Sequence, residues 1–234
     1  MVNYSPNPSR GIIYVYWGEQ PEAELERSIA SIKRFHPELP WEKIKIDDDS
    51  TLLNKSSMLK LSPFDSTLFL DTDTVILDRL DYGFEKAEQY GLACCINECP
   101  WARRYADIGG DQIEYNTGVL FFTKKASAVF DRWDEISHEI DSTLVFVNNG
   151  EPKVMPLNDQ AGFSQAIVDT GFNPFALPFN WNFRPMWHRS FFGPIKVWHD
   201  RSSPPPMLEQ WNGEQVLEPS IVKYSGNSNW IDVS

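Results

Sequence analysis

The opening of the chain has the pattern of a strand, a helix and a second strand, and this order limits the folds open to it. Residues 11–18, GIIYVYWG, form a short apolar run that is typical of a buried strand. Residues 21–35 carry apolar side chains at helical spacing, and residues 42–47 alternate like a second strand. Strands joined through a helix run parallel, so we expect an α/β fold with a mixed, mostly parallel sheet flanked by helices.

The remaining elements are less regular. Further strands are expected at residues 66–70, 91–96, 114–122 (interrupted by Gly118) and 194–198, and further helices at 56–61, 124–140 and 158–168. Residues 172–206 are rich in Pro, Trp and Phe and have little helical period. No repeat or linker divides the sequence, so we expect a single domain over residues 1–234.

Composition excludes several partners. The 234 residues carry a formal net charge of −12, which argues against nucleic acid or an anionic membrane as the main partner. The first ten residues lack an apolar signal region, and no apolar run approaches a membrane span, so a cytoplasmic protein with no transmembrane segment is expected. The three cysteines, Cys94, Cys95 and Cys99, are odd in number and favour buried thiols over a disulfide framework.

The stretch STLFLDTDTVIL, residues 66–77, places Asp71 and Asp73 at the end of an apolar strand. Residues i and i+2 of a strand point to the same face, so the two carboxylates would repel each other. A divalent cation between them removes that repulsion, and oxygen ligands suit Mg²⁺ and Mn²⁺. The pair therefore predicts a metal site. Three classes of protein have a metal site with two such aspartates.

Two of these classes fit incompletely. An EF-hand loop needs oxygen, Gly and Glu at positions that are occupied here by Val75, Ile76 and Tyr82, so that interpretation fails. A phosphatase of the haloacid dehalogenase type would use Asp71 as nucleophile and Asp73 as acid/base, with Mg²⁺ beside them. That family normally carries the motif on its first strand, whereas a strand-helix-strand unit precedes it here.

The third class is suggested by an ordered set of segments. The set comprises NKSSMLKL with Lys55, FLDTDTVIL with Asp71 and Asp73, YNTGVLFF with Asn116 and Gly118, LNDQAGF with Asp159 and Gln160, and IKVWHD with His199. In this order the chain resembles the GT-A fold nucleotide-sugar glycosyltransferases near glycogenin and the bacterial galactosyltransferases. The segment KYSGNSNW resembles that family's closing motif but has Lys223 where its His should be and Asn229 where its Lys should be. His199 is therefore the favoured third metal ligand.

The resemblance implies a role for each matched residue. Asp71, Asp73 and His199 would hold Mn²⁺ or Mg²⁺, and Asp71 could also contact the donor. Lys55 would bind the donor phosphates, Tyr14 and Tyr16 with Trp17 the base, and Asn116 and Gly118 the donor sugar, while Asp159 and Gln160 would lie near the anomeric carbon as catalytic residues. For the two tyrosines, packing in the core remains the alternative. Asp47, Asp48 and Asp49 could bind ribose or form a solvated turn.

The expected activity is a metal-dependent transfer of a hexose from a nucleotide-sugar, with a UDP-sugar as the expected donor and with retention. Residues of about 11–100 would bind the nucleotide and residues of about 101–234 the acceptor, which could be a carbohydrate or a protein- or lipid-linked group. Trp181, Trp187 and Trp198 either bind the acceptor or pack in the core. His188 is a second candidate histidine, after His199, for the neighbourhood of the active site. The phosphatase and a non-catalytic carbohydrate-binding protein remain the alternatives.

Overall fold

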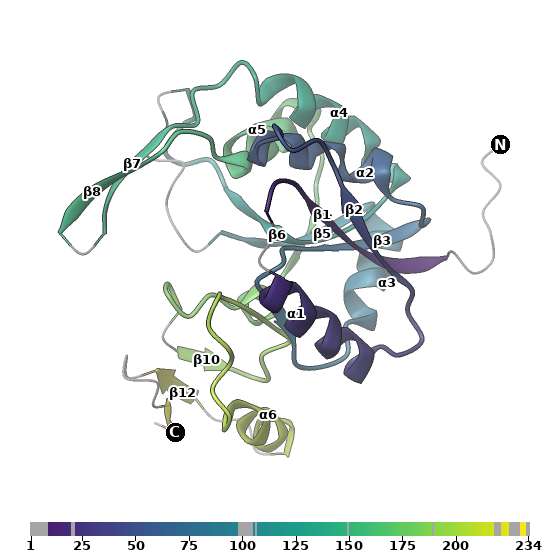
Figure 1. Cartoon of the computed structure of the whole chain (residues 1–234), viewed down its shortest axis with the longest axis vertical. Helices are drawn as coiled ribbons and strands as arrows, with labels where there is room; N and C mark the ends of the chain where they lie inside the picture. The colour runs from purple at the N-terminus through teal and green to yellow at the C-terminus, as the bar shows by residue number, and fades with distance from the viewer. Residues whose placement is uncertain are drawn as a thin grey trace.

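A six-stranded sheet with the order β2-β1-β3-β6-β5-β9 forms the centre of the computed structural model (Figure 1). The strands are β1 (Arg10–Tyr16), β2 (Trp41–Lys45), β3 (Ser66–Leu70), β5 (Leu92–Ile96), β6 (Tyr115–Thr123) and β9 (Phe175–Leu177). Because β6 pairs antiparallel with both β3 and β5 while the other pairs are parallel, β6 runs against the other five strands. The mixed, mostly parallel sheet is thus confirmed. The structure describes residues 9–19, 22–97, 105, 107–148, 150–188, 190–217, 221–224 and 230–232.

Helices cover both faces of this sheet (Figure 1). One face packs against α1 (Glu22–Phe35) and α3 (Asp81–Tyr90), and the other against α2 (Met58–Leu61), α4 (Ser127–Ile136) and α5 (Asp159–Thr170). The alternation of a strand explains this division, because Tyr14 belongs to the first cluster and Ile13 to the second. Burying each large apolar side chain contributes about 1.5–3 kcal/mol, so the sheet is stabilised from both sides.

Shorter elements surround the sheet. They are the 3-10 helix η1 (Leu52–Ser57), β4 (Thr74–Ile76), η3 (Lys124–Ala126), β7 (Leu144–Asn148), β8 (Glu151–Met155), η4 (Phe179–Asn182), β10 (Ser190–Phe192), β11 (Val197–His199), α6 (Leu208–Leu217), β12 (Ile221–Tyr224) and β13 (Trp230–Asp232). The β7–β8 hairpin projects from the body, while β10, β12 and α6 lie on the same side of the sheet as α1 (Figure 1). Strand β11 pairs antiparallel with β4, which returns a late segment of the chain to the end of β3.

Several elements differ from the sequence-based expectations. Strand β6 continues through Gly118, so the predicted interruption is not a break in the strand, but the register of β6 against β5 does shift there: Cys94 pairs with Leu120 and Ile96 with Tyr115, which leaves the extra residues on β6. The helix predicted over residues 124–140 is shorter, since η3 precedes α4 and residues 137–140 form turns. Helices α3 and α6 and the β7–β8 hairpin were not predicted. In α3, Gly83 weakens the helical signal; a Cβ there would lie 2.5 Å from the ring of Phe121, so close packing requires glycine.

Among the described residues, no helix combines the length and the apolar character needed to cross a membrane. Cys94 and Cys95 are buried free thiols, as expected, and burial raises the pKa of the Cys94 thiol. Cys99 and Asn229 lie outside the described residues, as does the side chain of Lys223.

Candidate active site

The candidate site lies at the edge of the sheet where β1 and β3 end. Strand β6 runs in the opposite direction, so its first residues reach the same edge. There the backbone N–H of Asp71 donates to the carbonyl of Gly118 at 2.8 Å. A Cβ on Gly118 would lie 2.3 Å from His199 Cε1 and 2.7 Å from Asp71 Oδ2, so this position has no room for a side chain. Two segments of the predicted site are therefore in contact.

Asp71 and Asp73 are brought together by a turn. Strand β3 ends at Leu70, and both the backbone N–H and the hydroxyl of Thr74 donate to the Asp71 carbonyl, at 3.2 and 2.8 Å. The sequence argument placed both carboxylates on one face of a continuing strand, and that geometry is wrong although the two side chains do converge. The turn also exposes them, since their side chains are 29% and 26% accessible at the floor of a cleft.

His199 completes this group of ligands. The pairing of β11 with β4 places His199 opposite Thr74, and its Nε2 lies 3.3 Å from Asp73 Oδ1 and 3.7 Å from Asp71 Oδ2. One ligand atom from each of Asp71, Asp73 and His199 lies within 4.8 Å of the others. Burial acts to raise the pKa of Asp73, but the hydrogen bond and charge of His199 and the charge of Lys55 bring it down to about 2. Two carboxylates and an imidazole are a donor set that suits a divalent cation.

Lys55 lies beneath the carboxylates. It comes from η1, is 3% exposed, and its Nζ lies 2.8 Å from Asp71 Oδ1 and 3.1 Å from Asp159 Oδ2. Burial favours the neutral amine, but Asp159 and Asp71 together raise the pKa of Lys55 above its usual value, so the side chain is charged. The ammonium group also lies 5.1 Å above the ring of Phe69. Lys55 therefore holds a carboxylate from β3 and one from α5 in fixed positions.

Asp159 and Gln160 begin α5. The side chain of Asn158 accepts a hydrogen bond from the backbone N–H of Gln160 at 3.0 Å, so Asn158 caps the helix. The hydroxyl of Thr117 donates to Asp159 Oδ2 at 2.5 Å. Both predicted catalytic residues are buried beside β6, with exposed fractions of 5% and 7%.

A chain of buried amide side chains connects His199 to α5. His199 Nδ1 lies 2.7 Å from Asn182 Oδ1, and Asn182 Nδ2 donates to Asn116 Oδ1 at 2.7 Å. Asn116 Nδ2 then donates to Gln160 Oε1 at 2.8 Å. Gln160 Nε2 donates to Glu114 Oε1 at 3.0 Å. The sequence analysis identified His199, Asn116 and Gln160 but missed Asn182 and Glu114, because neither stands in a recognisable motif.

A cleft of about 380 Å³ opens over Lys55, Asp71 and Asp73. Its lining consists of Val15, Tyr16, Trp17, Glu24, Leu52, Lys55, Asp71, Thr72, Asp73 and Arg201. This volume is within the range of small-molecule sites. Arg201 was also missed by the sequence analysis, although a basic residue two positions after a metal-ligand candidate in an acidic chain was a usable signal. Arg27 of α1 fixes the backbone there, donating to the carbonyls of Arg201 and Asp200 at 3.0 and 3.2 Å.

The predicted aromatic residues divide between core and cleft. Tyr16 and Trp17 line the cleft, whereas Tyr14 is 0% exposed and its hydroxyl lies 2.6 Å from Ser28 Oγ. Its ring is therefore part of the core, which was the alternative interpretation, and is not available to a base. Trp181 and Trp198 also pack in the core.

The remaining candidates lie away from the lining of the cleft. Trp187 is 39% exposed. His188 stacks on Phe179 with ring centroids 4.4 Å apart, and burial lowers its pKa. The side chains of Asp47, Asp48 and Asp49 are exposed, and Asp48 pairs with Lys45 at 2.8 Å.

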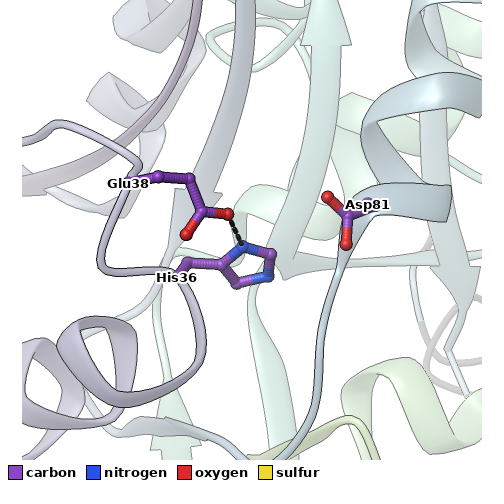
Figure 2. Close-up of side chains that lie close together, drawn as sticks. All are labelled: His36, Glu38 and Asp81. Atoms are coloured by element: carbon purple, nitrogen blue, oxygen red, sulfur yellow. Dashed lines mark hydrogen bonds and ion pairs between the residues drawn. The ribbon is translucent and has the colours of Figure 1, made fainter.

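A second group with the composition of a metal site, His36, Glu38 and Asp81, is shown in Figure 2, but its contacts indicate a structural role. Leu80 N–H donates to His36 Nε2 at 2.8 Å, so the ring proton is on Nδ1, which faces Glu38 at 3.2 Å. Neither ring nitrogen has a lone pair left for a metal. Arg79 also bonds to Glu38 and Asp81, at 2.6 and 2.7 Å, and neutralises both carboxylates. The group therefore connects the end of α1 to the start of α3.

Comparison with solved structures agrees with this architecture. The apo form of mouse xyloside xylosyltransferase 1 matches with a TM-score of 0.56 and 12% identity, over 82% of this chain and 97% of that one. Galactosyltransferase LgtC, solved with donor and acceptor sugar analogs, matches with a TM-score of 0.56 and 14% identity, over 89% and 94%. The apo form of GlyE from Streptococcus pneumoniae TIGR4 gives 0.52 and 13%, over 89% of this chain and 60% of that one. No protein-family model matches the chain, and no curated protein matches its sequence. At these identities the matches establish the GT-A-type fold that was expected.

Proposed function

We propose that this chain is a metal-dependent glycosyltransferase that transfers a hexose from a nucleotide-sugar, a UDP-hexose, to an acceptor. The observation that carries the proposal is the convergence of Asp71, Asp73 and His199 in a GT-A-type fold, with both carboxylates lining a cleft. These side chains supply oxygen and nitrogen ligands on different elements, so the donor set fits Mn²⁺ or Mg²⁺. When bound, the metal would act as a Lewis acid that offsets negative charge on the leaving diphosphate.

The other residues of the cleft have distinct tasks under this proposal. Arg201 faces the open cleft and offers a guanidinium to the phosphates, whereas Lys55 fixes Asp71 and Asp159 from below. Tyr16 and Trp17 offer rings on which the nucleotide base can stack. The nucleotide would thus lie over the ends of β1 and β3, within residues of about 11–100.

The donor sugar would lie toward α5 and the first residues of β6. Asn116 could offer the second hydrogen of its Nδ2 to a sugar hydroxyl, since its oxygen already accepts from Gly118 and Asn182, and Gly118 lets His199 and Asp71 approach the backbone of β6 closely. Asp159 and Gln160 would lie by the anomeric carbon and stabilise the positive charge that develops there. Retention of configuration is proposed because the segment containing this pair resembles that of retaining enzymes. The acceptor, a carbohydrate or a protein- or lipid-linked group, would enter from the side formed by residues of about 101–234.

The test measures slow release of nucleoside diphosphate from a panel of nucleotide-sugars in the presence of Mn²⁺. We expect release with a UDP-hexose, loss of release on adding a chelator, and loss in Asp73→Asn. Asp131→Asn is the matched control, since Asp131 lies exposed on α4 and should leave release unchanged. Phosphate release from phosphomonoesters instead would indicate the phosphatase, and glycan affinity indifferent to chelators would indicate a binding protein. Either result would overturn the proposal.

A further inference from the structure

The direction of every hydrogen bond in the chain of buried amides is fixed by one backbone group. The N–H of Gly118 donates to Asn116 Oδ1 at 2.9 Å, and a backbone N–H can act only as a donor. The atom of Asn116 at that position must therefore be the oxygen. Since Asn182 contacts the same oxygen at 2.7 Å, Asn182 must present its NH₂ group to Asn116.

The orientation of Asn182 then determines which ring nitrogen of a neutral His199 carries the hydrogen. With the NH₂ group directed at Asn116, the Asn182 oxygen faces His199 Nδ1 at 2.7 Å. An amide oxygen only accepts, so Nδ1 of His199 must carry the hydrogen. The far end of this hydrogen-bonded series of amides is consistent with the same orientation, because the NH₂ group of Gln160 donates to a carboxylate oxygen of Glu114.

This tautomer places a lone pair where a cation is needed. When the ring is neutral, Nε2 of His199 carries no hydrogen and faces Asp73 Oδ1 at 3.3 Å. Two lone pairs at this distance repel, and a proton or a metal ion between them removes the repulsion. A metal-ligating His usually donates its other N–H to an acceptor, which fixes the ring. A neutral amide does this without adding a further negative charge to a site that already contains three carboxylates, Asp71, Asp73 and Asp159.

We propose that Asn182 is a positioning residue that holds His199 in the Nδ1–H tautomer and connects it, through Asn116, to Gln160. This inference rests on the proposed function, because it assigns His199 Nε2 to a metal. All three side chains that form the connection are at least nine-tenths buried, with exposed fractions of 2%, 4% and 7% for Asn182, Asn116 and Gln160. The arrangement joins the metal-ligand side of the site to the sugar side.

The first experiment needs no variant of Asn182. Long-range ¹H–¹⁵N NMR of the metal-free protein at pH 8, with ¹⁵N-labelled histidine, reports which ring nitrogen carries the hydrogen. His199→Gln assigns the signal, and His36 serves as an internal reference because Leu80 N–H fixes its Nδ1–H form. We expect the hydrogen of His199 on Nδ1. At a pH where the ring is neutral, a hydrogen on Nε2 would overturn the proposal, whether or not any metal binds.

The second experiment compares Mn²⁺ affinities by calorimetry. Asn182→Leu keeps the volume but removes the acceptor, and we expect it to lose the Nδ1–H preference and to bind Mn²⁺ about 10–100-fold more weakly. Asn182→Asp keeps an acceptor at Nδ1 and should retain the tautomer, although it loses the donor to Asn116 Oδ1 and with it the connection to Gln160. Asn212→Leu is the control, since Asn212 is another buried amide, bonded to the backbone of Ile195. Wild-type Mn²⁺ affinity in a folded Asn182→Leu protein would contradict the proposal, whereas no Mn²⁺ binding by the wild type would contradict the proposed function instead.

Discussion

The absence of a side chain at Gly118 decides whether the candidate site can form. An added Cβ would meet His199 Cε1 at 2.3 Å and Asp71 Oδ2 at 2.7 Å, so two metal-ligand candidates would have to move. We expect Gly118→Ala to weaken Mn²⁺ binding at least tenfold in calorimetry, with a loss of unfolding free energy of about 1–3 kcal/mol from overpacking.

Gly109→Ala is the matched control, because an added Cβ there meets no atom within 4 Å. Equal Mn²⁺ affinities for wild type and Gly118→Ala would show that His199 and Asp71 do not act together. Among single residues, the sequence identified the positions that match the segments of the resembled family, including Asp71, Asp73 and His199. It could not predict Asn182 or Glu114, because their importance comes from contacts across the fold rather than from spacing along the chain.

The contact between α1 and α3 includes an ion pair of Arg79 with Glu38, and its contribution to stability depends on pH. Arg79 bonds to Glu38 and lowers the pKa of its carboxyl to about 2, against about 4.3 in an unfolded chain. A carboxyl with a depressed folded pKa stabilises the fold above its unfolded pKa and loses that contribution as pH falls toward 2. Glu38 is 48% exposed, so solvent screening reduces its effect to about 0.5 kcal/mol.

Urea unfolding of wild type and Glu38→Gln at several pH values measures this contribution. We expect wild type to be the more stable protein at pH 6 and the difference to shrink progressively below about pH 4. Glu42→Gln, an exposed change on β2, is the control and should show no such trend. A difference that grows as the pH falls would contradict the assignment.

The regular elements were the easiest part of the fold to predict. Helix α1 and strands β1 to β3 have clear periodicity, and all four were found close to their observed bounds. Helix α3 was missed because packing required a helix-breaking residue, Gly83, in its first turn. The β7–β8 hairpin was missed because most side chains of β8 are exposed, so that strand has no alternation between buried and exposed positions.

For the whole molecule, ligand binding should appear as added stability. If the cleft binds a nucleotide through a metal, Mn²⁺ with UDP at about 100 times the dissociation constant should add about 2.7 kcal/mol. For a chain of this size that corresponds to a rise in Tm of about 5–10 °C. Thermal unfolding followed by near-UV circular dichroism measures it. The rise should disappear with a chelator and in Asp73→Asn; a rise that survives in both would place the nucleotide elsewhere.

The pairing of β4 with β11 has a consequence for synthesis on the ribosome. Asp71 and Asp73 leave the exit tunnel early, together with β1, α1, β2 and β3, whereas His199 follows only after most of the chain has been made. A nascent chain can therefore begin to assemble its parallel strands before His199 joins the two carboxylates. If these three side chains hold a dication, as we propose, the ion would bind late and would stabilise a fold that is already largely assembled, rather than nucleate its early stages.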